Sequence, residues 1–316
     1  MKIVHVAVAV IQRGNDILIA HRPEHVHQGG LWEFPGGKVE SGETVQQALQ
    51  RELYEELGIE LDLHRGVQPL LRIRHDYADK SVLLDVWRVT QFKGDAKGVE
   101  GQPLRWVDKR SLANYKFPDA NKAIISAINL PPKYLITGGF DSVEECCTRL
   151  QAAITEHEIE IVQFRCHNMR LEDLIGYIAL GRSLAKLCRQ HKVAFLLNAP
   201  PDFLSHINAD GVHLTSSEAR LHKSRPIDLN KILGISCHNE EELILAKRLN
   251  PDYVILSPVK KTETHVNAVP LGWPTFQKLT DSTPFPVFAL GGMTTADMDD
   301  ALSMGAQGIA AIREWW

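Results

Sequence analysis

The sequence lacks the features that mark a membrane protein or a secreted protein. It contains no uninterrupted apolar run of the roughly 18 residues that indicate a membrane-spanning helix. The N-terminal segment MKIVHVAVAVIQRG alternates apolar and polar residues and leads to no small-residue cleavage site, so it indicates a strand rather than a signal peptide. We therefore predict a cytoplasmic protein with no membrane partner.

Cysteine is also scarce, and long basic tracts are absent. The formal net charge is −4, so the chain is not built to grip a nucleic-acid polymer, and its expected partner is a small molecule. The cysteines form no C-x-x-C pair and fit reduced core thiols better than disulfides or zinc ligands. The five of them are Cys146, Cys147, Cys166, Cys188 and Cys237.

The length of the chain predicts two domains. Its 316 residues exceed the size of one typical domain, which holds about 100–150 residues. Two prolines in the segment Asn129-Leu-Pro-Pro-Lys133 prevent a helix from continuing and favour an extended connector. We therefore expect one domain over residues 1–130 and a second over residues 131–316. The sequence leaves their orientation and the oligomeric state open.

An acidic motif lies on a predicted helix that ends at Gly58. Glu52, Glu55 and Glu56 lie at positions i, i+3 and i+4, so their carboxylates project from one face within reach of each other. Because like charges repel, a helix gains no stability from gathering them, whereas Mg²⁺ prefers carboxylate and carbonyl oxygens. The pattern favours a Mg²⁺ site, with Mn²⁺ as an alternative ion, and Arg51 as a side chain that orients Glu52. The competing interpretation is an ordinary charged helix face.

The same segment fits a family pattern. GKVESGETVQQALQRELYEELGI, residues 37–59, matches G-x5-E-x7-R-E-U-x-E-E-x-G-U with U aliphatic, and so resembles the Nudix hydrolases. The resemblance implies hydrolysis of a nucleoside diphosphate linked to another group. Glu43, Glu52 and Glu100 are each possible general bases, and we favour Glu52. The implied metal ligands are the Gly37 carbonyl and the side chains of Glu52, Glu55, Glu56 and Glu100.

Four segments resemble the MutT branch, the 8-oxo-dGTP diphosphatases: AHRP at 20–23, WEFPGGKVESGE at 32–43, EGQPLRW at 100–106 and FPDANKAI at 117–124. This resemblance implies that Arg22, Phe34 and Asn121 frame the purine and that Asp79 contacts the base. An amide such as Asn121 offers both a donor and an acceptor to an oxidised guanine. In the alternative interpretation Phe34 is a core residue, Arg22 pairs with a carboxylate and Asn121 caps its helix.

The predicted fold class is α/β, with an N-terminal Nudix α/β/α sandwich followed by a C-terminal (β/α)8 TIM barrel. In the first domain we expect strands over residues 4–11, 17–21, 67–75, 81–90 and 104–107, with a closing helix over 119–128. From residue 134 onward, short apolar runs alternate eight times with helical patterns, which predicts a closed parallel barrel. The expected barrel strands are residues 134–137, 159–165, 194–198, 211–214, 232–237, 253–257, 286–290 and 308–312.

The barrel resembles thiamine phosphate synthase and TenI in its segments QFR, ADGVHL, GISCH, YVILSPV and ALGGM. The resemblance implies a phosphate site at Gly291 and Gly292 and, if the barrel is a thiazole tautomerase, a proton-transferring role for His238. The chain departs from the synthase pattern after the third strand, where Asn198-Ala199-Pro200 replaces the Asn-Asp-Arg end. The aspartate that would hold Mg²⁺ is therefore missing, and we expect a binding or regulatory barrel.

The predicted function is Mg²⁺-dependent hydrolysis of 8-oxo-dGTP to the monophosphate and pyrophosphate, which would remove an oxidised nucleotide and prevent mutation. The alternative is a Nudix hydrolase of a thiamine-related or other non-guanine diphosphate, with a barrel that acts as a thiazole tautomerase or binds a thiamine-precursor phosphate. A third hypothesis makes the barrel a non-enzymatic sensor.

Overall fold

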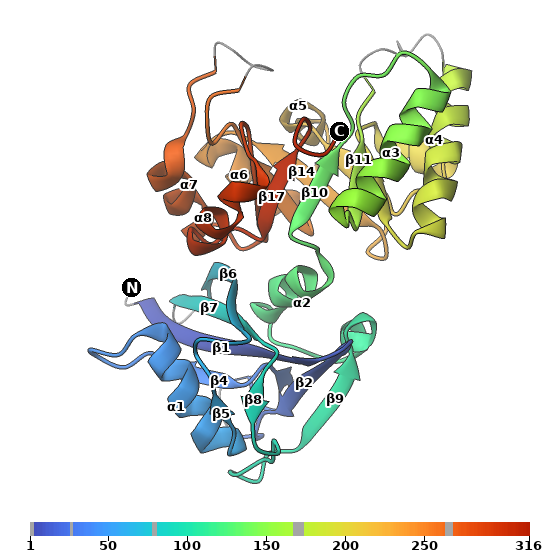
Figure 1. The fold of residues 1–316 in the computed structure, drawn as a ribbon. Coiled ribbons are helices and arrows are strands. Elements are labelled where there is room, and N and C mark those ends of the chain that lie inside the picture. Colours follow the sequence, from blue (N-terminus) through green and yellow to red (C-terminus); the bar gives the residue numbers. More distant parts are fainter. Residues whose placement is uncertain (1–2, 26–27, 78–80, 167–173, 263–267) are drawn as a thin grey trace. The chain divides into compact units, whose positions relative to one another are not determined.

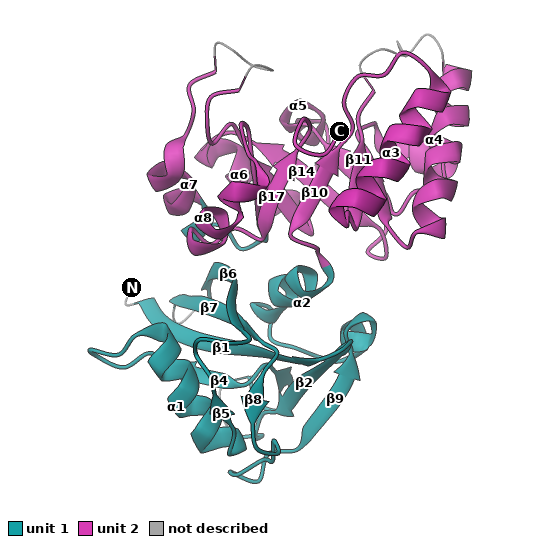
Figure 2. Cartoon of the chain, in the orientation of Figure 1, with its two compact units in different colours: residues 1–129, 280–286 teal, residues 130–279, 287–316 magenta. Residues whose placement is uncertain are grey.

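The computed structural model describes residues 3–25, 28–77, 81–166, 174–262 and 268–316 (Figure 1). The chain divides into two compact units (Figure 2). One unit holds residues 1–129 and 280–286, and the other holds residues 130–279 and 287–316. A domain boundary between residues 130 and 131 stays a prediction. Among the described residues, no helix has the length and the apolar character needed to cross a membrane.

The first unit is built on a mixed sheet whose central strand is β1 (Ile3–Arg13). β1 runs parallel to β7 and antiparallel to β2 and β4, and the main strand order is β3-β2-β1-β7-β6, with β9 paired to β2. The other strands are β2 (Asp16–His21), β3 (Trp32–Glu33), β4 (Gly36–Lys38), β6 (Val67–Asp76), β7 (Ser81–Val89) and β9 (Leu104–Asp108), beside a separate pair of β5 (Glu60–Leu61) and β8 (Phe92–Lys93).

Side chains alternate along β1 and so divide between two apolar cores. Val8 and Val10 pack on one face with α2 (Asn121–Asn129), whereas Ala7, Ala9 and Ile11 pack on the other with α1 (Val45–Leu57). A 3-10 helix, η1 (Lys109–Asn114), precedes α2. The sheet with a helix on each face confirms the predicted α/β/α sandwich.

The second unit is a closed barrel of eight parallel strands in sequential order, which confirms the predicted (β/α)8 fold. A cluster of buried side chains, among them Tyr134, Tyr253 and Phe288, fills its interior. Its strands are β10 (Lys133–Ile136), β11 (Ile161–Phe164), β12 (Ala194–Leu197), β13 (Gly211–Leu214), β14 (Ile232–Cys237), β15 (Tyr253–Leu256), β16 (Val287–Leu290) and β17 (Gly308–Ala311).

Helices connect most of these strands. One connection differs, because a short 3-10 helix, η2 (Pro201–Ser205), joins β12 to β13 where the repeat pattern favours an α-helix. Pro201 occupies the first position of η2, where the missing N–H of a proline costs no hydrogen bond. The α-helices are α3 (Val143–His157), α4 (Leu174–Gln190), α5 (Ser216–Arg220), α6 (Glu240–Leu249), α7 (Gly272–Asp281) and α8 (Met298–Ser303), and the 3-10 helix η4 (Thr295–Asp297) precedes α8.

Candidate functional site

Helix α1 carries the acidic motif of the first unit, and its ends are fixed by local capping. The Thr44 side chain accepts a hydrogen bond from the Gln47 amide, and the Gln47 side chain accepts one from the Thr44 amide. Gly58 ends the helix in the left-handed conformation, with φ of 67°. The apolar face of α1, which is Ala48, Leu49, Leu53 and Leu57, is fully buried. The acidic face is therefore held in a fixed rotation about the helix axis.

Arg51 binds three carboxylates of the motif. Its guanidinium donates two hydrogen bonds to Glu43, of 2.9 and 3.0 Å, and one of 2.9 Å to Glu52. A longer bond of 3.3 Å reaches Glu55, and a bond of 3.0 Å reaches the Lys38 carbonyl. The hydrogen bonds from Arg51 hold the pKa of Glu43 below its ordinary value. This arrangement agrees with the prediction that Arg51 orients Glu52, and it makes Glu43 a weaker base than a free carboxylate.

Glu56 faces other carboxylates instead of a cation. Its Oε2 accepts a hydrogen bond of 3.2 Å from the Gly36 amide. Burial raises the pKa of Glu56 to about 8, and the negative charges of Glu33, Glu52 and Glu100 add to that shift. The negative charges of Glu56 and these three neighbours thus repel each other, which is unfavourable for the protein alone and favourable for a bound cation.

The glycines of β4, which precedes α1, pack against the same carboxylates. A β-carbon at Gly37 would lie 2.1 Å from the carboxyl carbon of Glu52, so only glycine fits there without displacing that side chain. Gly36 has φ of 141°, and a β-carbon there would lie 2.2 Å from the Ala7 carbonyl oxygen. The backbone of β4 therefore lies close to Glu52, and the Gly37 carbonyl as a metal ligand stays a prediction.

The carboxylates do not converge on one point. Within the described part of the chain, no three Asp, Glu, His or Cys side chains gather as closely as metal ligands do. Arg51 draws Glu52 and Glu55 toward itself, and more than half of the Glu55 side chain is exposed. The predicted trio therefore shares a helix face without converging. The donor set still fits a hard divalent cation, because it consists of carboxylate oxygens with mutual repulsion.

Glu33 is a site residue that the sequence interpretation missed. Its carboxylate forms an ion pair with Arg22, and burial raises its pKa although Arg22 opposes that shift. It also adds to the negative charge around Glu56. The available signal was its position between Trp32 and Phe34 in the matched segment WEFPGG. Arg22 is thus a partner of a carboxylate that reaches the acidic cluster.

The remaining predicted nucleotide residues occupy different environments. Phe34 is only 3% exposed and stacks on Phe117, with ring centroids 5.3 Å apart, so its ring is packed in the hydrophobic core. Asn121 begins α2 and is 9% exposed. Glu100 is exposed and close enough to Glu56 to raise its pKa. Asp79 lies outside the described residues.

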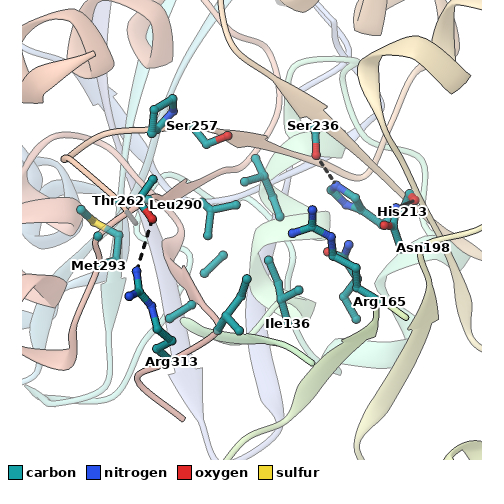
Figure 3. A pocket seen from close by; sticks show the side chains of 18 of the residues that line it. Ile136, Arg165, Asn198, His213, Ser236, Ser257, Thr262, Leu290, Met293 and Arg313 are labelled. Carbon is teal, nitrogen blue, oxygen red and sulfur yellow. Dashed lines mark hydrogen bonds between the residues drawn. The ribbon is translucent and has the colours of Figure 1, made fainter. Parts of the chain in front are cut away.

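The second unit has a cavity of about 1050 Å³ at the carboxyl ends of its strands (Figure 3). The predicted residues His238, Gly291 and Gly292 line it, and both glycines have positive φ, of 101° and 65°. Two guanidinium groups that the sequence interpretation did not single out, those of Arg165 and Arg313, line it as well. The cavity therefore combines cationic side chains with glycine backbone, which suits an anionic ligand.

His238 lies at the rim of this cavity and is bound to the following helix. Its Nδ1 and the Glu242 Oε2 are 2.8 Å apart, and its backbone amide donates to the same oxygen over 2.9 Å. Partial burial acts to raise the pKa of Glu242, but the bonds from His238 outweigh it, and the pKa lies below its ordinary value. His238 thus contacts the following helix and also lines the cavity, and its proton-transferring role stays a prediction.

Two family matches divide the chain in the same way as the fold. Residues 6–127 match the family described as "NUDIX domain", and residues 133–315 match the family described as "Thiamine monophosphate synthase". The chain belongs to both families. Its Nudix unit is a hydrolase of the Nudix type, and its barrel is a thiamine phosphate synthase-like, TenI-like domain.

Different curated relatives match the two units. The Nudix unit is 39% identical over 127 residues to a CTP pyrophosphohydrolase of Escherichia coli, covering 40% of this chain and 92% of that protein. It is 36% identical over 129 residues to an 8-oxo-dGTP diphosphatase of the same organism, covering 40% of this chain and 98% of that protein. The barrel is 33% identical over 159 residues to a thiamine-phosphate synthase of Methanospirillum hungatei, covering 48% of this chain and 74% of that protein.

Proposed function

We propose that the Nudix unit hydrolyses 8-oxo-dGTP to the monophosphate and pyrophosphate with Mg²⁺. The observation that carries this proposal is the half-buried Glu56. Three other carboxylates add negative charge around it, and the Gly36 amide donates a hydrogen bond to it. Such a position is stabilised by a divalent cation that is itself bound to the phosphates of a substrate. Removal of 8-oxo-dGTP from the nucleotide pool would prevent its incorporation into DNA.

Mg²⁺ would be held by the Gly37 carbonyl and by Glu52, Glu55, Glu56 and Glu100, and when bound it neutralises charge on the bridging oxygen and lowers the pKa of a bound water. Glu52 takes a proton from the attacking water. The water oxygen forms a bond to the phosphorus, and the bond between that phosphorus and the oxygen of the departing pyrophosphate breaks. Arg51 keeps the Glu52 carboxylate in place through its bond of 2.9 Å. Glu43, which is bound twice by Arg51, orients the guanidinium.

The choice of an oxidised guanine depends on Asn121 and Arg22. Asn121 is buried at the start of α2, where its amide has both a donor and an acceptor for the edge of a base. Arg22 is held by Glu33 beside the acidic cluster, where it would help to frame the purine. A base that lacks the matching groups would leave the buried amide without a hydrogen-bond partner, so the site discriminates strongly against that base.

The test is steady-state hydrolysis by the full chain of 8-oxo-dGTP, dGTP and CTP, with and without Mg²⁺. We expect kcat/KM for 8-oxo-dGTP to exceed that for dGTP by at least tenfold. Equal values for those two substrates would contradict the substrate assignment. CTP is included because a CTP pyrophosphohydrolase is among the relatives of this unit, and faster hydrolysis of CTP would assign a cytosine substrate instead.

For the barrel we propose binding of a small phosphorylated heterocycle, such as a thiamine precursor. The supporting observation is the 1050 Å³ cavity, whose lining includes Gly291, Gly292, Arg165 and Arg313. The missing acidic residue after β12, where Ala199 stands, disfavours metal-assisted departure of a diphosphate. Isothermal titration of the full chain with a thiazole phosphate should give binding heat, and the Arg165→Met variant should lose it. Tautomerase activity would be assigned only if His238→Ala removed a measurable turnover.

A further inference from the structure

A continuous chain of buried polar side chains crosses the inside of the barrel. It begins at Gln163 on β11, passes through Tyr134, Tyr253 and His213, and ends at Ser236 on β14. The successive distances are 3.2 Å from the Tyr134 hydroxyl to the Gln163 Oε1, 2.6 Å between the two tyrosine hydroxyls, 3.1 Å from the Tyr253 hydroxyl to the His213 Nδ1, and 2.8 Å from the His213 Nε2 to the Ser236 Oγ. Figure 3 shows the last of these bonds at the edge of the cavity.

The packing around this chain leaves its members little freedom. Tyr134 and Tyr253 are fully buried, and His213 and Gln163 are 1% and 3% exposed. A β-carbon at Gly234 would lie 2.1 Å from the Tyr253 hydroxyl oxygen and 2.7 Å from the His213 Nδ1. The glycine thus leaves the space in which these two groups meet. Gln163, His213 and Ser236 all line the cavity, so both ends of the chain reach the same ligand space.

The number of available protons fixes the direction of every bond. The Gln163 Oε1 can only accept, so the single hydroxyl proton of Tyr134 points to it. The Tyr253 proton must then point to Tyr134, because those two oxygens are 2.6 Å apart and one of them has to donate. The bond between Tyr253 and His213 is left without a tyrosine proton, so the His213 Nδ1 carries the hydrogen.

The imidazole has only one proton to give. Burial lowers the pKa of His213 to about 3, and the nearby charge of Arg165 acts in the same direction. The neutral ring with a proton on Nδ1 has a lone pair on Nε2, and the Ser236 hydroxyl donates to it. The Ser236 oxygen therefore keeps its lone pairs for the cavity. At the other end, the Gln163 Nε2 has no hydrogen-bond partner among the described residues, so its two protons remain available.

We propose that this chain makes His213 a positioning residue, which holds the Nδ1–H tautomer and sets Ser236 as an acceptor opposite the donor amide of Gln163. A ligand of the barrel then presents an acceptor to Gln163 and a donor to Ser236. If the two groups of the ligand are exchanged, its donor faces the donor amide of Gln163 and its acceptor faces the acceptor oxygen of Ser236. Such a ligand is rejected. This selectivity is separate from the charge of the arginines, which acts on the anionic part of a ligand.

The experiment measures the His213 tautomer in the full-length chain labelled with ¹⁵N-histidine. Long-range ¹H–¹⁵N spectra distinguish a protonated from an unprotonated ring nitrogen, and the His213→Gln variant assigns the signals. We expect a neutral ring with the proton on Nδ1 throughout the range from about pH 5 to pH 8. A proton on Nε2, a protonated ring or an equal mixture of tautomers in the wild-type chain would overturn the proposal.

A variant remote from the imidazole tests the relay itself. Tyr134→Phe removes the acceptor of the Tyr253 proton, which should then turn to the His213 Nδ1 and move the imidazole proton to Nε2 in most molecules. The matched control is Tyr177→Phe, because the buried Tyr177 hydroxyl has no hydrogen-bond partner in the described part of the chain, and it should leave the tautomer unchanged. An unaltered His213 in the folded Tyr134→Phe variant would also overturn the proposal. If that variant does not fold, the wild-type tautomer decides alone.

Discussion

A β-carbon on Gly37 would lie 2.1 Å from the carboxyl carbon of Glu52. Two residues from different elements, β4 and α1, are thus in contact where no larger side chain fits.

The Gly37→Ala variant should hydrolyse nucleotides at least tenfold more slowly than the wild-type chain, because the methyl group displaces Glu52. The control is Gly14→Ala, at a left-handed position where no atom lies within 4 Å of the added carbon. That control should lose about 1 kcal/mol of stability through backbone strain and keep its turnover. Steady-state kinetics and thermal melting of both variants provide the measurement.

The stability of the metal-free chain should fall as the pH rises from about 5 to 8. The folded state raises the pKa of Glu56 from 4.5 to about 8, so in that interval it binds more protons than the unfolded state, and a higher pH favours unfolding. The slope contributed by one such group is about 1 kcal/mol per pH unit. Melting in EDTA should show this slope in the wild-type chain and a smaller one in Glu56→Gln.

The same variant should respond differently to metal. Adding Mg²⁺ at pH 8 should raise the melting temperature of the wild-type chain, because the cation neutralises the repulsion around Glu56. Glu56→Gln should melt above the wild type in EDTA, gain less from Mg²⁺ and lose most of its hydrolysis. A wild-type melting temperature that is insensitive to Mg²⁺ would contradict the assignment of these carboxylates to a metal.

Arg51→Lys should lower kcat by at least tenfold with little change in KM. A lysine cannot reproduce the fork that binds Glu43 twice and Glu52 once, so the general base would lose its orientation while the nucleotide site is unchanged. Arg65→Lys is the matched control, because Arg65 is exposed and lies outside the cluster. A fall in kcat/KM that comes only from KM would assign Arg51 to substrate binding instead.

Asn121→Ala should reduce the preference for 8-oxo-dGTP over dGTP by at least tenfold, since the amide is proposed to read the base edge. The control Asn129→Ala changes the exposed asparagine at the other end of α2 and should keep the preference. Competition between the two substrates in one reaction measures the ratio directly. An unchanged ratio in a folded Asn121→Ala variant would remove this residue from base recognition.

Local patterns were sufficient for much of the architecture. The sequence predicted the helix that ends at Gly58, which is α1, and the eight repeats predicted the closed barrel. These predictions succeed because the periods of helices and strands depend on neighbouring residues. The two-residue and three-residue strands β3 and β4 were missed, since segments so short have no period.

The sequence by itself determined the families, the order of the elements and the set of acidic side chains on α1. Only the tertiary structure decided that Glu56 is the half-buried carboxylate, that Glu33 joins the cluster and that Phe34 stacks on Phe117 in the core. It also decided the chain from Gln163 to Ser236, whose members come from five different strands. Burial and hydrogen-bond partners depend on which distant segments pair, as β1 does with both β4 and β7, and no local period encodes such a pairing.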